Sequence, residues 1–344
     1  MNWWSRKAFV PLLCGWFTIV ALICGVHVTA AQESLTESRP KFDVTIGTWI
    51  SVGDTRWAHN ASSSSPLLGD PTSKLTYKDV GTNVFDLAGT LWFTPQLFGR
   101  LNFGIAGIGG GRLTDDDFLA ADRGNPSSRT ISDLSGDGMW YLNADAGGRV
   151  TNFPNHRGWL DVFGGFQYWH TEYTAVGLGQ VTCTTAGSTV DLDPSTPGPD
   201  PLCAPGTSIS SGVNVITNTT NWYSIRLGGK SEYRLTRRFS VLGTLAFIPA
   251  SLLDDKDVHH LRADLSQDPS FSMVGYGVGA DADVGARFMI TTNLAANVGY
   301  RMYYNRVLSG HLTTHPVVGS SESFPLTQFE SLRHGFTASL SLIF

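Results

Sequence analysis

The sequence has few charged residues, few signals of helix formation and, beyond residue 31, no long apolar run. Charged residues make up 15% of the chain. No segment after residue 31 approaches the ~20 consecutive apolar residues that a membrane-spanning helix requires. The net charge of −5 provides no basic face for nucleic acid. These absences argue against a helical membrane protein and against a nucleic-acid-binding protein.

The first 31 residues have the pattern of a secretory signal peptide. Arg6 and Lys7 form a positive start, residues 8–28 are mostly apolar, and the small residues at 28–31 form a cleavage signal. A retained membrane anchor is the other interpretation of this segment. We therefore expect residues 1–31 to be a signal peptide and residues 32–344 to form the mature domain.

Cysteine is scarce, with four residues in the chain. Cys14 and Cys24 lie in the expected signal peptide, which leaves Cys183 and Cys203. An even pair in an exported chain predicts one disulfide, which here would close a loop rich in proline and glycine. The pair lacks the CxxC spacing and nearby histidines of a metal site. No metal or other cofactor is therefore expected from the residues.

Apolar residues instead alternate with polar ones over ten segments, which is the pattern of β-strands. Each segment is close to or longer than the ~9–11 residues that a tilted strand needs to cross a membrane. The segments are residues 42–52, 83–93, 99–108, 138–150, 159–173, 221–234, 239–251, 272–289, 293–306 and 329–344.

The polar faces of these segments carry charges: Asp86, Asp145, Arg226, Lys230, Asp281, Asp283, Arg287 and Arg301. In a membrane barrel the apolar face meets lipid and the polar face lines the interior. Short and long connections also alternate, as in barrels with short periplasmic turns and long outer loops. The sequence therefore predicts an all-β fold, a ten-stranded antiparallel transmembrane barrel of the bacterial outer membrane. Because such a barrel is narrow, paired inward charges should fill its lumen, and function should reside at the outer mouth.

Two acidic segments are expected in loops at that mouth. Asp115 and Asp117 share one side of an extended segment, and Asp257 and His259 have the same spacing. The two loops are four strands apart in a ring of ten, so they lie nearly across the barrel. Histidine is the usual general base, and a carboxylate fixes its tautomer. The residues thus suggest a water-activating site, in which Asp116 or His260 could replace Asp115 or His259.

At these motifs the chain resembles the omptin family of outer-membrane endopeptidases. The resemblance extends over nearly the whole mature chain at low identity. It includes Gly47-Thr48, the Asp-x-Asp-aromatic segment 115–118, the turn 152–157 and the Asp-x-His segment 257–259. It implies peptide-bond hydrolysis without a covalent intermediate, by water held between Asp115 and Asp117 on one side and His259, oriented by Asp257, on the other.

The resemblance also implies partners and specificity. Asp255 matches a position that accepts a basic substrate side chain, while the second acidic position falls near Trp57, which is not acidic. Family members act on polypeptides as cell-surface enzymes and require lipopolysaccharide. We expect a monomer in outer-membrane lipid with its site facing outside. The competing hypothesis is a non-enzymatic barrel, namely an adhesin, a structural protein or a narrow channel.

Overall fold

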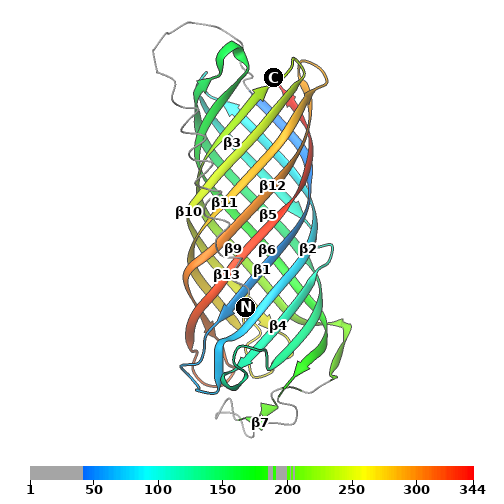
Figure 1. The fold of residues 1–344 in the computed structure, drawn as a ribbon, viewed down its shortest axis with the longest axis vertical. Helices are drawn as coiled ribbons and strands as arrows, with labels where there is room; N and C mark the ends of the chain where they lie inside the picture. The colour runs from blue at the N-terminus through cyan, green and yellow to red at the C-terminus, as the bar shows by residue number, and fades with distance from the viewer. Residues whose placement is uncertain (1–41, 185–188, 191–199, 202, 204–205) are drawn as a thin grey trace. The chain divides into compact units, whose positions relative to one another are not determined.

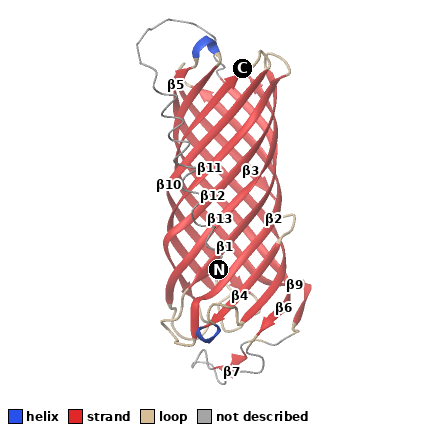
Figure 2. Ribbon diagram, in the orientation of Figure 1, coloured by secondary structure: helices blue, strands red, loops and turns tan. Residues whose placement is uncertain are grey.

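The computed structural model describes residues 42–184, 189–190, 200–201, 203 and 206–344. The expected signal peptide lies outside these residues. Almost all of the described chain is strand (Figures 1 and 2). Among the described residues, no helix is long and apolar enough to cross a membrane. The main strands are β1 (Phe42–His59), β2 (Leu68–Trp92), β3 (Leu97–Ala106), β4 (Arg112–Leu119), β5 (Ser128–Asn152), β6 (Gly158–Cys183), β9 (Ser208–Arg234), β10 (Phe239–His259), β11 (Phe271–Met289), β12 (Leu294–Thr314) and β13 (Ser323–Ile343).

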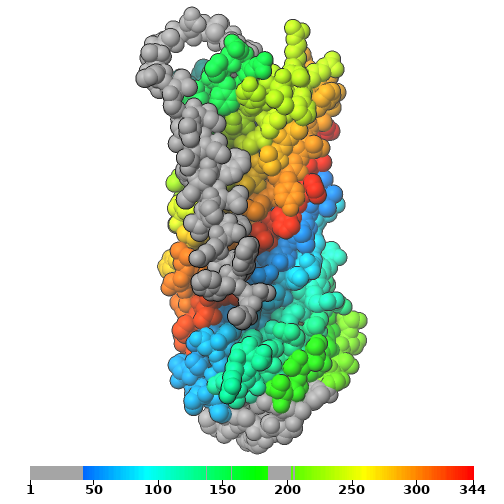
Figure 3. Space-filling model, viewed as in Figure 1, coloured from blue at the N-terminus to red at the C-terminus, as the bar shows by residue number. Residues whose placement is uncertain are grey.

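These strands close into a ring of ten antiparallel positions. Eleven strands form the sheet, but β3 and β4 follow one another along one position between β2 and β5. The ring closes where β1 pairs with β13, from Asp43 opposite Ile343 to the mouth. The blue and red ends of the chain accordingly lie side by side in Figures 1 and 3. The predicted ten-stranded barrel is confirmed.

The connections also follow the prediction. Four short turns, at residues 93–96, 153–157, 235–238 and 290–293, gather at the end where β13 finishes. The longer connections, together with the small pair β7 (Thr189–Val190) and β8 (Asp200–Pro201), lie at the opposite end (Figure 1). We call that end the mouth.

The strands extend farther toward the mouth than the sequence pattern predicted. Asp115 and Asp117 lie in β4, and Asp257 and His259 lie in β10. The prediction that both acidic segments are loops is therefore wrong. Side chains in these strand ends still alternate between the inside and the outside. Polar side chains such as Lys256 point outward, while carboxylates and apolar side chains share the inward positions. Because the two faces differ little in polarity here, the sequence does not show the alternation that identifies a strand.

Apolar side chains cover the outer surface of the half of the barrel that lies away from the mouth. We call this surface the belt, and its exposed residues include Ile46, Ile50, Phe85, Leu101, Ile105, Phe166, Ile225, Phe247, Val284, Val298, Phe336 and Leu340. Toward the mouth it ends in a row of neighbouring positions, Tyr168, Tyr223, Leu252 and Tyr276. An apolar band bordered by aromatic residues is the lipid-facing surface of an outer-membrane barrel.

Ion pairs and stacked aromatic rings fill the interior behind the belt. Arg226 lies between Asp145 and Asp281, with N–O distances of 3.2 and 2.8 Å. Trp169 stacks on Tyr303, with centroids 3.9 Å apart. A further guanidinium, that of Arg301, bonds to Asp86 and Asp283. The prediction of a lumen filled by paired charges is confirmed, and a cavity among these residues measures about 50 Å³.

Candidate functional site

The first half of the candidate site lies on three neighbouring strands. Trp57 of β1 is opposite Leu75 of β2, and Leu75 is opposite Asp115 of β4. Because directly opposite residues share one face of a sheet, the Asp115 side chain faces the interior with the buried Trp57 and Leu75. Asp117, two residues farther along β4, points the same way, nearer the rim.

The register separates Asp116 from this pair. Asp116 points to the other face, where its carboxylate accepts hydrogen bonds from Nε and Nη2 of Arg129 at 2.5 and 2.9 Å. Inside, the Ser73 hydroxyl lies 3.5 Å from Oδ1 of Asp115. Of the three consecutive aspartates, the structure therefore directs Asp115 and Asp117 toward the interior.

The second half of the site lies on β10. Nε2 of His259 is 3.7 Å from Oδ2 of Asp257, and the His259 ring packs edge-on against Phe271 with centroids 4.9 Å apart. The backbone N–H of His259 donates to Ser270 Oγ at 2.9 Å. His260 turns away and contacts the Thr217 hydroxyl instead, at 2.9 Å. The neighbouring histidines thus have different surroundings, and His259 is the one beside a carboxylate.

The two halves are close enough to act on one another electrostatically. Burial, followed by the charges of Asp117 and Asp257, holds the pKa of Asp115 well above its usual range. Asp117 reaches solvent, but the barrel wall around its carboxylate limits hydration and so raises its pKa. The charge of His259 opposes this shift. Carboxylates and an imidazole from β4 and β10 therefore form one charge cluster across the mouth.

Several polar atoms of this cluster have no hydrogen-bond partner among the described residues. Both carboxylate oxygens of Asp257 and Nε2 of His259 are buried without a hydrogen bond to any described residue. Buried polar groups normally find a partner in protein or water. These atoms therefore have hydrogen-bonding capacity for a bound water or substrate.

Asp255 lies one inward position below Asp257 and is differently placed. It is completely buried. Asn218 donates to both its oxygens at 3.0 and 3.1 Å, and Thr220 donates at 2.6 Å. Burial and the charge of Asp257 raise its pKa well above the usual range. The structure thus places Asp255 beneath the cluster, with its oxygens already bonded.

Sequence reasoning missed two inward residues of the mouth, Tyr77 and His59. Burial and then the charge of His259 lower the pKa of His59 to about 4, so this ring is neutral at neutral pH. The buried Tyr77 hydroxyl has no hydrogen-bond partner among the described residues. Both residues lie between the predicted strand segments, and only the strand register reveals that they face the site.

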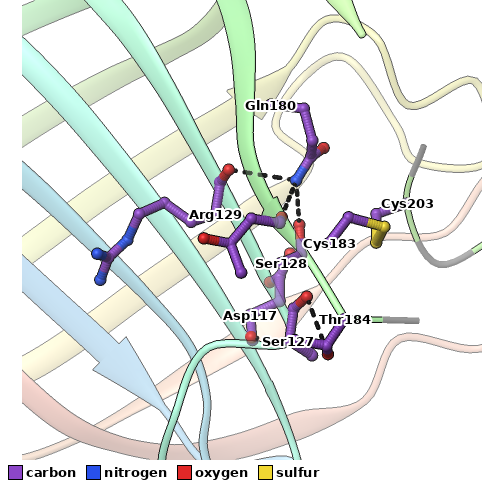
Figure 4. The surroundings of a disulfide bond; sticks show 9 residues. Asp117, Ser127, Ser128, Arg129, Gln180, Cys183, Thr184 and Cys203 are labelled. Atoms are coloured by element: carbon purple, nitrogen blue, oxygen red, sulfur yellow. Dashed lines mark hydrogen bonds between the residues drawn. A yellow bond between two sulfur atoms is a disulfide. The ribbon is translucent and has the colours of Figure 1, made fainter. Parts of the chain in front are cut away.

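A disulfide lies in the wall next to Asp117. Cys183 and Cys203 are bonded, as expected from the sequence. Ser128 of β5 is opposite both Asp117 and Cys183. The N–H and hydroxyl of Ser127 donate to the Asp117 carbonyl at 2.8 and 2.9 Å. Figure 4 shows Asp117, Ser127 and Ser128 near the disulfide. The disulfide ties Cys203 to the end of β6, and β5 lies between β6 and the strand that carries Asp117.

The fold and the belt define a ten-stranded β-barrel of the outer-membrane type. Neither the known protein-family models nor the curated protein sequences match this chain. Among solved structures, the outer-membrane protease OmpT from Escherichia coli is similar, with a TM-score of 0.68 and 16% identity over 91% of this chain and 99% of that one. The translocator domain of the autotransporter NalP from Neisseria meningitidis matches with a TM-score of 0.35 and 9% identity, over 99% and 100% of the two chains. The similarity to OmpT establishes a shared fold.

Proposed function

We propose that this protein is an endopeptidase of the bacterial outer membrane that resembles omptins. The observation that carries the proposal is the convergence of Asp115 and Asp117 on β4 with Asp257 and His259 on β10. Three strands separate β4 from β10 in the ring, so only barrel closure brings these side chains to one place. Perturbed carboxylates clustered with a histidine in an open mouth are typical of a hydrolytic site.

In this mechanism His259 accepts a proton from a water molecule while the water oxygen attacks the peptide carbonyl carbon. Asp257 orients the imidazole and stabilises its charged form. The Asp115–Asp117 pair, which shares a proton because its pKa values are raised, holds the water from the opposite side. Breakage of the C–N bond then transfers the histidine proton to the leaving amine, and no covalent enzyme intermediate is required.

The position of the belt supports the inference that the candidate site lies outside the membrane. Asp257 lies five residues beyond Leu252, the position of the aromatic border on β10, which is roughly 17 Å along the strand at ~3.4 Å per residue. In outer-membrane barrels the end with longer connections faces outward. We propose that polypeptides reach the site from outside, that the protein acts as a monomer, and that lipopolysaccharide around the mouth supports activity.

A preference for basic substrate residues has little support. Asp255 is buried and its oxygens are occupied by Asn218 and Thr220. Near the expected second acidic position, Trp57 packs beside His59, which is neutral at neutral pH. A cationic side chain would find no free carboxylate at these two positions.

Peptide cleavage tests the proposal. The barrel, refolded with and without lipopolysaccharide, is incubated with a diverse peptide library, and the products are identified by mass spectrometry. His259→Ala and the double variant Asp115→Asn/Asp117→Asn should lose cleavage while remaining folded. His260→Ala and Asp116→Asn are matched controls one residue away and should keep it.

Two outcomes would contradict the proposal: no cleavage by the wild type in either lipid condition, or cleavage unaffected by His259→Ala. The function would then be adhesion or a structural role. The filled lumen gives little support to the alternative of a narrow channel.

A further inference from the structure

Tyr77 of β2 lies at the base of the candidate site, and neither the sequence motifs nor the proposed mechanism account for it. The residue has no exposed surface. Its hydroxyl is buried without a hydrogen-bond partner among the described residues. A buried hydroxyl normally has a partner in protein or water, so this group requires an explanation.

The strand register places Tyr77 between the two halves of the cluster. On one side, Tyr77 follows Leu75 by two residues on the inward face of β2, and Leu75 is opposite Asp115. On the other side, the Tyr77 ring contacts Tyr173, with centroids 5.3 Å apart. Tyr173 is opposite Asn218, which is in turn opposite Asp257. The phenol therefore extends from the β4 side toward the β10 side beneath both carboxylates.

The charges around Tyr77 determine what its hydroxyl can do. Burial, followed by the charges of Asp257, Asp255 and Asp115, raises the pKa of Tyr77 well above its usual range. The hydroxyl consequently keeps its proton and is available as a donor. The Asp257 oxygens, which also lack a partner among the described residues, are acceptors on the same inward face.

We propose that Tyr77 is a positioning residue of the hydrolytic site, whose hydroxyl donates to a structural water that in turn donates to Asp115 and Asp257. This inference rests on the proposed function. One water with one acceptor and two donor bonds would satisfy the Tyr77 hydroxyl and an oxygen of each carboxylate. It would hold the two dyads in alignment on either side of the reacting water.

Tyr77→Phe tests this role because it removes the oxygen and keeps the ring. We expect kcat to fall roughly 10- to 100-fold, as for a small displacement of catalytic groups, while KM changes little. The acid limb of the pH–rate profile should also shift, because the carboxylates lose a shared partner. Tyr303→Phe is the matched control, since it removes another buried hydroxyl that contacts Asn305 inside the lumen, and it should retain the wild-type profile.

A high-resolution crystal structure supplies a measurement independent of activity. An ordered water within hydrogen-bond distance of Tyr77 Oη and of both carboxylates supports the proposal, and a hydroxyl bonded directly to protein overturns it. If His259→Ala is inactive while Tyr77→Phe matches the wild type, the positioning role is wrong and the proposed function stands. If the wild type cleaves nothing, the positioning role falls with the proposed function, and the crystal structure alone decides whether the water bridge exists.

Discussion

The belt half and the mouth half of this barrel share the same alternation of inward and outward side chains, but they differ in what covers the outside and in what bonds to the inward carboxylates. In the belt half the outside is apolar, and the inward carboxylates of Asp145 and Asp281 bond to Arg226. In the mouth half the outside carries the Asp116–Arg129 pair, whereas the inward Asp115 contacts the neutral Ser73. An inward carboxylate of the belt half is thus held by a guanidinium, whereas the inward Asp115 and Asp257 of the mouth half have no guanidinium bonded to them among the described residues.

The largest expected difference concerns catalysis. Asp257→Asn should reduce kcat/KM by about 10² to 10⁴, the usual contribution of positioned acid–base groups, because His259 loses its orienting carboxylate. Asp283→Asn, which changes a carboxylate bonded to Arg301 in the belt half, should change kcat/KM little. Steady-state peptide cleavage is measured for the two folded variants. Equal losses of kcat/KM would contradict the assignment of catalysis to the mouth half and of structural charges to the belt half.

The next effect concerns stability. Arg226→Met leaves Asp145 buried without its cation and should cost about 3–5 kcal/mol of unfolding free energy. Arg56→Met in the mouth half removes a half-exposed pair with Asp54 and Glu330 and should cost less than ~1 kcal/mol. Urea unfolding in lipid vesicles measures both, and a larger loss for Arg56→Met would contradict the assignment of structural charges to the belt.

A smaller effect is expected from the disulfide. Cys183→Ser/Cys203→Ser opens a loop with a sequence separation of 20 residues and should lower stability by roughly 2–3 kcal/mol. Because only β5 separates the disulfide-bearing end of β6 from the strand of Asp117, peptide cleavage should also weaken, with the larger change in KM. Comparison of oxidised and reduced wild type with the double variant checks this. If reduction of the disulfide leaves both stability and KM unchanged, the cysteine loop does not influence the candidate site.

The smallest effect is a pH dependence. The pKa of Asp115 is raised in the folded state, so between the usual aspartate value and that raised value the folded protein binds more protons than the unfolded one. Stability should therefore fall as pH rises through this window. Asp115→Asn should make the curve of unfolding midpoint against pH flatter. A steeper curve for the variant would mean that the Asp115 carboxylate is stabilised in its charged form.

The fold was predictable from sequence chiefly where lipid is the outer solvent. In segments such as 221–234 and 272–289, apolar outward residues contrast strongly with charged inward ones, and both strands are present. Toward the mouth the outside becomes polar while the inside mixes carboxylates with aromatic rings. The contrast then weakens, which explains why β4 and the mouth ends of β1, β2 and β10 were not predicted as strands.

The candidate site was partly predictable for a related reason. The spacing of Asp115 with Asp117 and of Asp257 with His259 is a local pattern and can be seen in the sequence. The choice of Asp115 over Asp116 depends on which face of β4 each occupies, and Tyr77 reaches the site only through register and contact with Tyr173. Such facts depend on pairings between strands distant in the chain, which the sequence does not display.

The seam between β1 and β13 has a consequence for biogenesis. The last strand of the chain must pair with the first before the ring is complete, and β4 and β10 are held at a fixed separation only in the complete ring. Under the proposed function, a nascent or partly assembled chain would carry all the catalytic residues and yet be inert, as a zymogen is. Closure of the seam would then be the activating event, which protects neighbouring polypeptides during export without a propeptide or a separate inhibitor.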